Sequence, residues 1–223
     1  MRSVKAIIRD CRANLAGWVI VAEKQKVFVD VDTQRDFLDV AGALHVPRSD
    51  EIRPNLSRLT QCAIERGFPI IATACAHTLD DEELRHFPPH CLAGTVGQSR
   101  IPETEVGDAV VLGVDARLEG EPPRHLTLEK REYDVFSRSD ATAIMARYNK
   151  DKPTFVVYGV ATDYCVRAVV LGLLERRMDV AVVVDAIRAI DATREPALLT
   201  EFARKGGMLT TTDHVCRAPK TVS

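Results

Sequence analysis

Three side chains that can act together in covalent catalysis follow or end short apolar runs: Asp32, Lys130 and Cys165. Cys165 stands at the first turn of a predicted helix, directly after a predicted strand. Unpaired N–H groups at such a turn favour a thiolate and can stabilise an oxyanion beside it. Because a thiol needs a base or a cation to react near neutral pH, Asp32 and Lys130 are candidates for these roles. The structural alternatives are a packed cysteine, a cap at Asp32 and a solvated amine at Lys130.

Short strands that alternate with amphipathic helices must position these residues. Six strands are predicted, at 27–31, 69–74, 109–114, 154–158, 180–184 and 208–210. Four helices are predicted, one carrying Ile52, Leu56, Leu59 and Ala63 and the others over 139–148, about 163–177 and 195–205. Unbroken apolar strands are typical of a sheet covered on both faces. We therefore expect one doubly wound α/β domain with a mostly parallel, six-stranded sheet and helices on both faces.

The carboxyl ends of parallel strands are where such a sheet binds ligands. Four polar places qualify, namely 30–36, 75–91, Lys130 at the end of the run 126–129, and 162–165. The segment 76–105 is rich in Pro and Gly and is too long for a simple connection, so we expect it to form part of a site. The folded domain is predicted to span 26–223, after an N-terminal arm over 1–25 whose structure the sequence does not define.

Composition limits the class of protein and the kind of partner. The 223 residues are 46% hydrophobic and 28% charged, which is ordinary for a folded soluble domain. A formal charge of −2 shows no excess of basic residues that would favour binding to nucleic acid or anionic lipid. No apolar run approaches the roughly 18 residues of a membrane span. The six cysteines form no C-x-x-C pair, which is typical of reduced cytoplasmic thiols. We expect a cytoplasmic homo-oligomer with a small-molecule partner and no organic cofactor.

Three motifs stand in the order found in a known family. D-x-Q-x-D-F begins at Asp32, K-x-x-x-x-x-F begins at Lys130, and 159–166 reads G-V-x-T-x-x-C-V. From 26 to about 212 the chain resembles the isochorismatase-like cysteine hydrolases, which include nicotinamidases. The resemblance implies that Asp32 is the general base, Lys130 the supporting cation and Cys165 the nucleophile.

The resemblance also implies an oxyanion hole. It would be formed by the backbone N–H groups of Ala161 and Cys165. A cis peptide bond between Val160 and Ala161 would turn the first of these groups toward the oxyanion.

A metal site is a further implication of the resemblance. The family writes it as D-x-H and W-P-x-H-C, and the corresponding stretches here are 75–77 and 87–91. His77 and His90 are present, but Cys75 stands where the family has aspartate. Cys75, His77 and His90 are still a reasonable ligand set for Zn²⁺ or another divalent metal. The alternatives are ordinary loop packing, or carboxylates drawn from 80–82.

The expected activity is hydrolysis of a C–N bond in a small carboxamide through a cysteine thioester, with nicotinamide as the leading substrate. The first alternative is another small amide, a carbamoyl compound or a ureide. Isochorismatase-type hydrolysis is disfavoured because relatives with that activity lack the cysteine. A non-catalytic member is disfavoured because it need not keep Asp32, Lys130 and Cys165 together.

Overall fold

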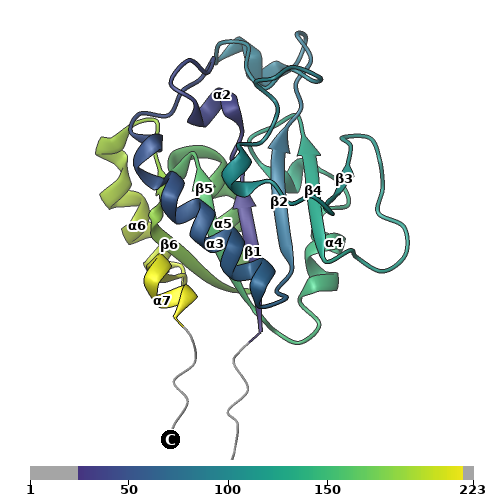
Figure 1. Cartoon of the computed structure of the whole chain (residues 1–223), viewed down its shortest axis with the longest axis vertical. Coiled ribbons are helices and arrows are strands. Elements are labelled where there is room, and N and C mark those ends of the chain that lie inside the picture. Colours follow the sequence, from purple (N-terminus) through teal and green to yellow (C-terminus); the bar gives the residue numbers. More distant parts are fainter. Residues whose placement is uncertain (1–24, 218–223) are drawn as a thin grey trace, which may run out of the picture.

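The computed structural model describes residues 25–217, so the predicted arm lies almost entirely outside the described residues. One seven-stranded sheet of parallel strands forms the centre of the molecule, in the order β3-β4-β2-β1-β5-β6-β7 (Figure 1). The strands are β1 Lys26–Val31, β2 Ile70–Cys75, β3 Val110–Leu112, β4 His125–Lys130, β5 Thr154–Val160, β6 Asp179–Arg188 and β7 Met208–Thr210. The doubly wound α/β class predicted from the sequence is confirmed.

The predicted count of six strands is wrong, because the run that ends at Lys130 forms a seventh, β4. This strand lies between β2 and β3, and its register places Lys130 beside Cys75. It does not read as an unbroken apolar run, since Thr127 and Glu129 alternate with its two leucines. Thr127 is nevertheless buried, so neighbouring strands and not hydrophobicity define this element.

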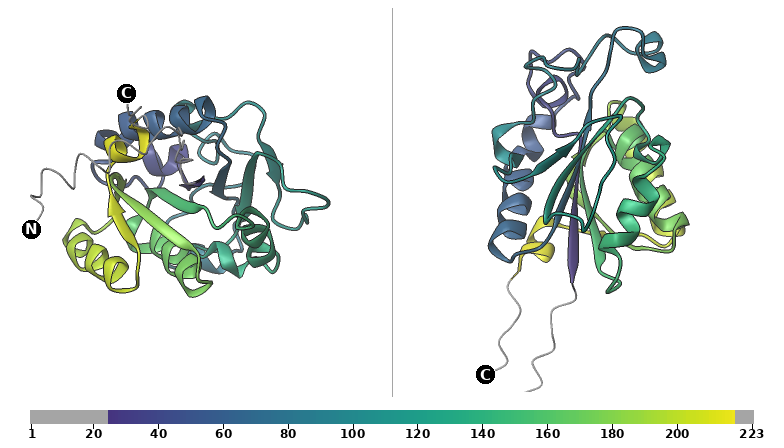
Figure 2. Two further views of the ribbon diagram at one scale, coloured as in Figure 1. Left: turned by 90° about the horizontal axis from the view of Figure 1, so that it is seen from below. Right: turned by 90° about the vertical axis from the view of Figure 1, so that its right-hand side faces the viewer.

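Helices cover both faces of the sheet, as predicted (Figure 2). Two separate apolar clusters fill the spaces between the layers. One face carries α2 Arg35–Leu38, α3 Arg53–Glu65 and α7 Thr212–Cys216, and the other carries α4 Ala141–Tyr148, α5 Arg167–Glu175 and α6 Glu195–Arg204. Short 3-10 turns are η1 Ser49–Ile52, η2 Glu82–Arg85, η3 Pro102–Thr104, η4 Val135–Ser137 and η6 Ala192–Arg194. The stripe predicted for α3 is fully buried.

The helix predicted from about 163 begins differently from an ordinary α-helix. Residues Thr162–Val166 form a π-helical turn, η5, and the α-helix α5 follows it. The N–H of Val166 donates to the carbonyl of Ala161, five residues back. Single π turns of this kind are frequent at functional sites, and this one carries Cys165.

Gly159 precedes this turn at a position that only glycine fits. Its φ is +115°, and a Cβ would overlap the backbone of Val31 in the neighbouring strand. We expect Gly159→Ala to destabilise the fold by about 2 to 4 kcal/mol, measured by denaturant unfolding. Gly107→Ala is the matched control, because nothing lies within 4 Å of its Cβ position. Equal stabilities of the two variants would contradict this explanation.

Two further findings concern the described part of the chain. No helix there has the length and apolar character needed to cross a membrane. Its five cysteines are all free thiols.

Candidate active site

The ends of three elements bring Asp32, Lys130 and Cys165 together. Asp32 follows β1, Lys130 ends β4 and Cys165 lies in η5. Nζ of Lys130 is 2.8 Å from Oδ2 of Asp32 and 3.7 Å from Sγ of Cys165. Asp32 and Lys130 are fully buried and Cys165 is 6% exposed. A carboxylate, an ammonium and a thiol therefore share one site from which water is largely excluded.

The conformation of Asp32 aims its carboxylate at this site. Its φ is +48°, in the left-handed region that aspartate tolerates better than most residues. The hydroxyl of Thr73 on β2 donates a 2.5 Å hydrogen bond to Oδ1. Burial raises the pKa of Asp32, and the opposing charge of Lys130 lowers it only in part. Such a carboxylate holds a proton more readily than an exposed one, which suits a base that must take and return a proton.

Lys130 remains charged although it is buried. Desolvation alone would lower its pKa, but the negative charges of Asp32 and of the two nearby thiols outweigh that effect, so the pKa of Lys130 is raised well above its usual range. A permanently protonated ammonium group can stabilise a thiolate but cannot act as the base. Asp32 is therefore the candidate for the base.

Cys75, at the end of β2, places a second thiol beside the first. Its Sγ lies 3.1 Å from Nζ of Lys130 and 3.9 Å from Oδ2 of Asp32. The neighbouring Cys165 and the charge of Lys130 lower the pKa of Cys75, while the neighbouring Cys75 and burial raise the pKa of Cys165. Both thiols thus contact the ammonium group that pairs with Asp32.

The backbone around Cys165 has the conformation that the resemblance implies. The peptide bond between Val160 and Ala161 is cis. Ala161 and Cys165 both line the same cavity. The two residues predicted to supply the oxyanion donors therefore border the same space.

The three predicted metal ligands also meet. One ligand atom each from Cys75, His77 and His90 lies within 4.8 Å of the others, and all three side chains are buried. His77 and His90 come from the long segment after β2, which was predicted to form part of a site. The rings lie edge to face with centroids 4.8 Å apart.

Hydrogen bonds fix both imidazoles so that Nε2 is available. Nδ1 of His77 is 3.1 Å from Oδ2 of Asp81, and Nδ1 of His90 is 2.9 Å from the carbonyl oxygen of Pro88. Each Nδ1 then carries the proton, which leaves Nε2 as a lone-pair donor. Nε2 of His77 is buried and has no hydrogen-bond partner. An unpartnered buried nitrogen beside a thiol is what a divalent metal would satisfy, so the residues present fit such an ion.

The carboxylates proposed as alternative ligands lie elsewhere. Asp81 accepts a hydrogen bond from Nδ1 of His77, on the side of the ring opposite the candidate metal site. Glu82 pairs with Arg85 at the surface. Sequence reasoning missed Glu83, whose Oε1 lies 3.9 Å from Nε2 of His77 and 3.8 Å from Nε2 of His90. Burial and the charge of Cys75 raise its pKa. Its position in a run of four acidic residues, 80–83, gave no signal to separate it from its neighbours.

A small cavity opens onto Cys165. It measures about 20 Å³, which is room for about one water molecule and not for an aromatic amide. It is lined by Phe37, Leu44, Glu83, Phe87, His90, Tyr133, Ala161, Tyr164, Cys165 and Ile190. A hollow of about 520 Å³ adjoins it and shares Glu83, Phe87 and Tyr133 as lining residues. Substrate entry therefore requires the aromatic side chains between the two spaces to move.

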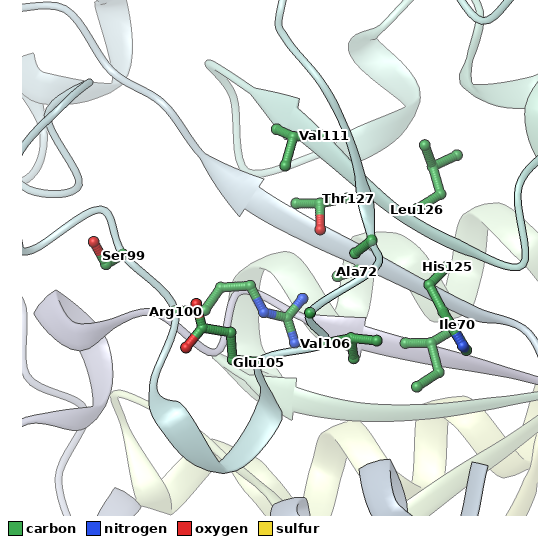
Figure 3. A pocket seen from close by; sticks show the side chains of 12 residues that line it. Ile70, Ala72, Ser99, Arg100, Glu105, Val106, Val111, His125, Leu126 and Thr127 are labelled. Atoms are coloured by element: carbon green, nitrogen blue, oxygen red, sulfur yellow. The ribbon is translucent and has the colours of Figure 1, made fainter. Parts of the chain in front are cut away.

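A separate pocket of about 360 Å³ lies on the β2, β3 and β4 side of the sheet (Figure 3). Its lining includes Ile70 and His125, the first residues of β2 and β4, whereas Cys75 and Lys130 end these strands. The guanidinium of Arg100 points into this region and pairs with the buried Asp30. Asp32, Lys130 and Cys165 do not line it.

Comparisons with known proteins identify the family and the fold. The sequence matches the model of the isochorismatase domain over residues 26–214. The structure is similar to pyrazinamidase of Pyrococcus horikoshii in complex with zinc, at 27% identity and a TM-score of 0.68, over 84% of this chain and 99% of that one. No curated protein sequence matches significantly.

Two further solved structures share the fold. One is N-carbamoylsarcosine amidase from Thermoplasma acidophilum, at 24% identity and a TM-score of 0.67, over 85% of this chain and 97% of that one. The other is pyrazinamidase/nicotinamidase from Streptococcus mutans, at 23% identity and a TM-score of 0.70, over 83% of this chain and 100% of that one.

Proposed function

The chain belongs to the isochorismatase family, and we propose that it hydrolyses the C–N bond of a small carboxamide through a thioester on Cys165. The observation that carries this proposal is the contact of one buried ammonium, that of Lys130, with both the Asp32 carboxylate and the Cys165 thiol. A candidate nucleophile that lines the cavity is thus joined to a candidate base and a supporting cation buried behind it. The likeness to a pyrazinamidase at 27% identity supports the same class of reaction.

The reaction follows from the roles that the geometry favours. Asp32, whose Oδ2 contacts the same Lys130 ammonium as the Cys165 thiol, takes the thiol proton while Lys130 stabilises the thiolate. The thiolate attacks the amide carbon, and the N–H groups of Ala161 and Cys165 stabilise the oxyanion. Asp32 returns the proton to the nitrogen, ammonia leaves, and a water molecule activated by Asp32 releases the acid.

The lining of the cavity favours a neutral, flat substrate. It is mostly aromatic and aliphatic, and among the described residues that line it there is one acid, Glu83, and neither arginine nor lysine. An acyl group with a carboxylate, such as a carbamoyl amino acid, would meet the acidic Glu83 and find no lysine or arginine in this lining to pair with, which is unfavourable. Nicotinamide is therefore the leading substrate, and carbamoyl compounds or ureides are the alternative.

Ammonia release from a panel of amides tests the substrate class. The panel contains nicotinamide, benzamide, a short aliphatic amide and an N-carbamoyl amino acid. We expect the highest kcat/KM with the aromatic amides. A higher kcat/KM with the N-carbamoyl amino acid would favour carbamoyl compounds as the substrate class instead. Release of ammonia from none of the four compounds would contradict the proposal.

A divalent metal fits beside this cavity, with Cys75, His77 and His90 as its ligands. A bound zinc ion would supply an open coordination position for a ring nitrogen of the substrate. A thiolate ligand reduces the charge left on the ion. The three residues are therefore assigned to substrate positioning more than to bond cleavage.

Zinc binding gives a separate prediction. Protein purified without chelator is expected to contain about one zinc per chain, measured by elemental analysis. His77→Ala should lose the metal and raise KM more than it lowers kcat, because ground-state binding is what the ion supports. His125→Ala is the control, since this histidine lies at the other end of β4. Protein without metal that also fails to take up added zinc would contradict the site.

A further inference from the structure

The active site contains two thiols where its proposed chemistry needs one. Sγ of Cys75 lies 3.1 Å and Sγ of Cys165 lies 3.7 Å from the same Lys130 ammonium nitrogen. Both sulfur atoms thus contact one buried ammonium group. We propose that hydroperoxides convert this pair into a disulfide, so that Cys165 is a site of reversible oxidation and Cys75 is its resolving partner.

The exposure of the two residues sets the order of the steps. Cys165 lines the cavity that adjoins the outer hollow, whereas Cys75 is fully buried and does not line that cavity. A peroxide about the size of water therefore meets Cys165 first. The nearby ammonium of Lys130 favours the thiolate that reacts.

The chemistry balances without any other reagent. The Cys165 thiolate attacks one oxygen of the peroxide, the O–O bond breaks, and Cys165 becomes a sulfenic acid as the peroxide leaves as water or an alcohol after protonation. The Cys75 thiolate then attacks the sulfenic sulfur and displaces hydroxide, which leaves as water. Two thiols and one hydroperoxide thus give one disulfide, with the peroxide as the electron acceptor.

The surroundings select Cys75 over the other cysteines of the described residues. The thiol of Cys91 points to the carbonyl of Gly97 and not to Lys130. Cys62 belongs to α3, and Cys216 belongs to α7, where its thiol points to the carbonyl of Arg58. Cys75 is thus the thiol placed to intercept an oxidised Cys165 before a second peroxide can carry it to the irreversible sulfinic acid.

The disulfide would remove the proposed nucleophile and one candidate metal ligand together. Hydrolysis would stop, and a dithiol reductant would restore both. Mass spectrometry detects the cross-link itself, so the test does not depend on the amide-hydrolase proposal.

Peptide mapping of the native protein is the direct experiment. Trypsin places Cys75 in 67–85, Cys91 in 86–100 and Cys165 in 151–167, so each thiol is identified separately. After brief exposure to dilute hydrogen peroxide, with and without a chelator, we expect 67–85 linked to 151–167. Dithiothreitol should separate the two peptides and restore at least most of any activity lost.

Two variants complete the test. In Cys75→Ser and Cys75→Ala the same exposure should add two oxygens to 151–167, and dithiothreitol should not reverse it. Cys91→Ser is the matched control and should still form the link. The proposal is overturned if native protein gives oxidised 151–167 without a link to 67–85, or if 151–167 links to 86–100 instead.

Discussion

Replacing Cys165 by alanine is expected to abolish amide hydrolysis while leaving the fold intact. The change removes one sulfur from a π-helical turn, at a position next to a cavity, so little core packing is lost. Without the thiol no thioester can form, and only substrate binding and the oxyanion donors remain. We expect kcat to fall by a factor on the order of 10⁴.

A matched variant separates chemistry from packing in this experiment. Cys62→Ala removes a sulfur from α3 at the same exposure, 6%, and Cys62 does not line the cavity next to Cys165. It should retain the activity of the native protein. Comparable activities of the two alanine variants, each checked for folding by circular dichroism, would exclude the thioester mechanism.

Loss of the Lys130 charge should change the pH dependence as well as the rate. Asp32 must be ionised to accept the thiol proton, so activity falls as the pH drops through the pKa of Asp32. Burial raises that pKa and Lys130 lowers it in part. Lys130→Met removes the lowering effect, so the acid limb of kcat/KM should move to higher pH while the maximum falls by a factor on the order of 10².

Lys150→Met is the control for this shift, because Lys150 pairs with Glu121 at the surface. Its pH profile should match that of the native protein. Asp32→Asn should lose the acid limb and nearly all activity. If the limb stays in place in Lys130→Met, the ammonium does not act on Asp32 and its assigned role is wrong.

The sheet was largely predictable because its inner strands are apolar without interruption. That pattern fails for β4, where Thr127 and Glu129 alternate with leucines and only the pairing with β2 and β3 defines a strand. The π turn at Thr162–Val166 was not predictable either. A π turn has hydrogen bonds between residues five apart, whereas those of an α-helix join residues four apart. A pattern of apolar side chains over only five residues does not distinguish the two.

Sequence motifs named the residues of the site but not all of their contacts. Asp32, Lys130 and Cys165 could be expected together because each follows or ends a strand at the same edge of a parallel sheet. The approach of Cys75 to Lys130 could not, because the resemblance placed Cys75 only in a metal site. Glu83 was missed for a similar reason, since its contact with both histidines depends on how η2 folds.

The central claim, a covalent intermediate on Cys165, is tested most directly by partitioning with hydroxylamine. Nicotinamide and methyl nicotinate share one acyl group but have different leaving groups, so both should give the same acyl-enzyme. We predict that hydroxylamine diverts both substrates to the hydroxamate, with one ratio of hydroxamate to acid that depends only on its concentration. Ratios that differ between the two substrates, or acid as the sole product at every concentration, would contradict the account.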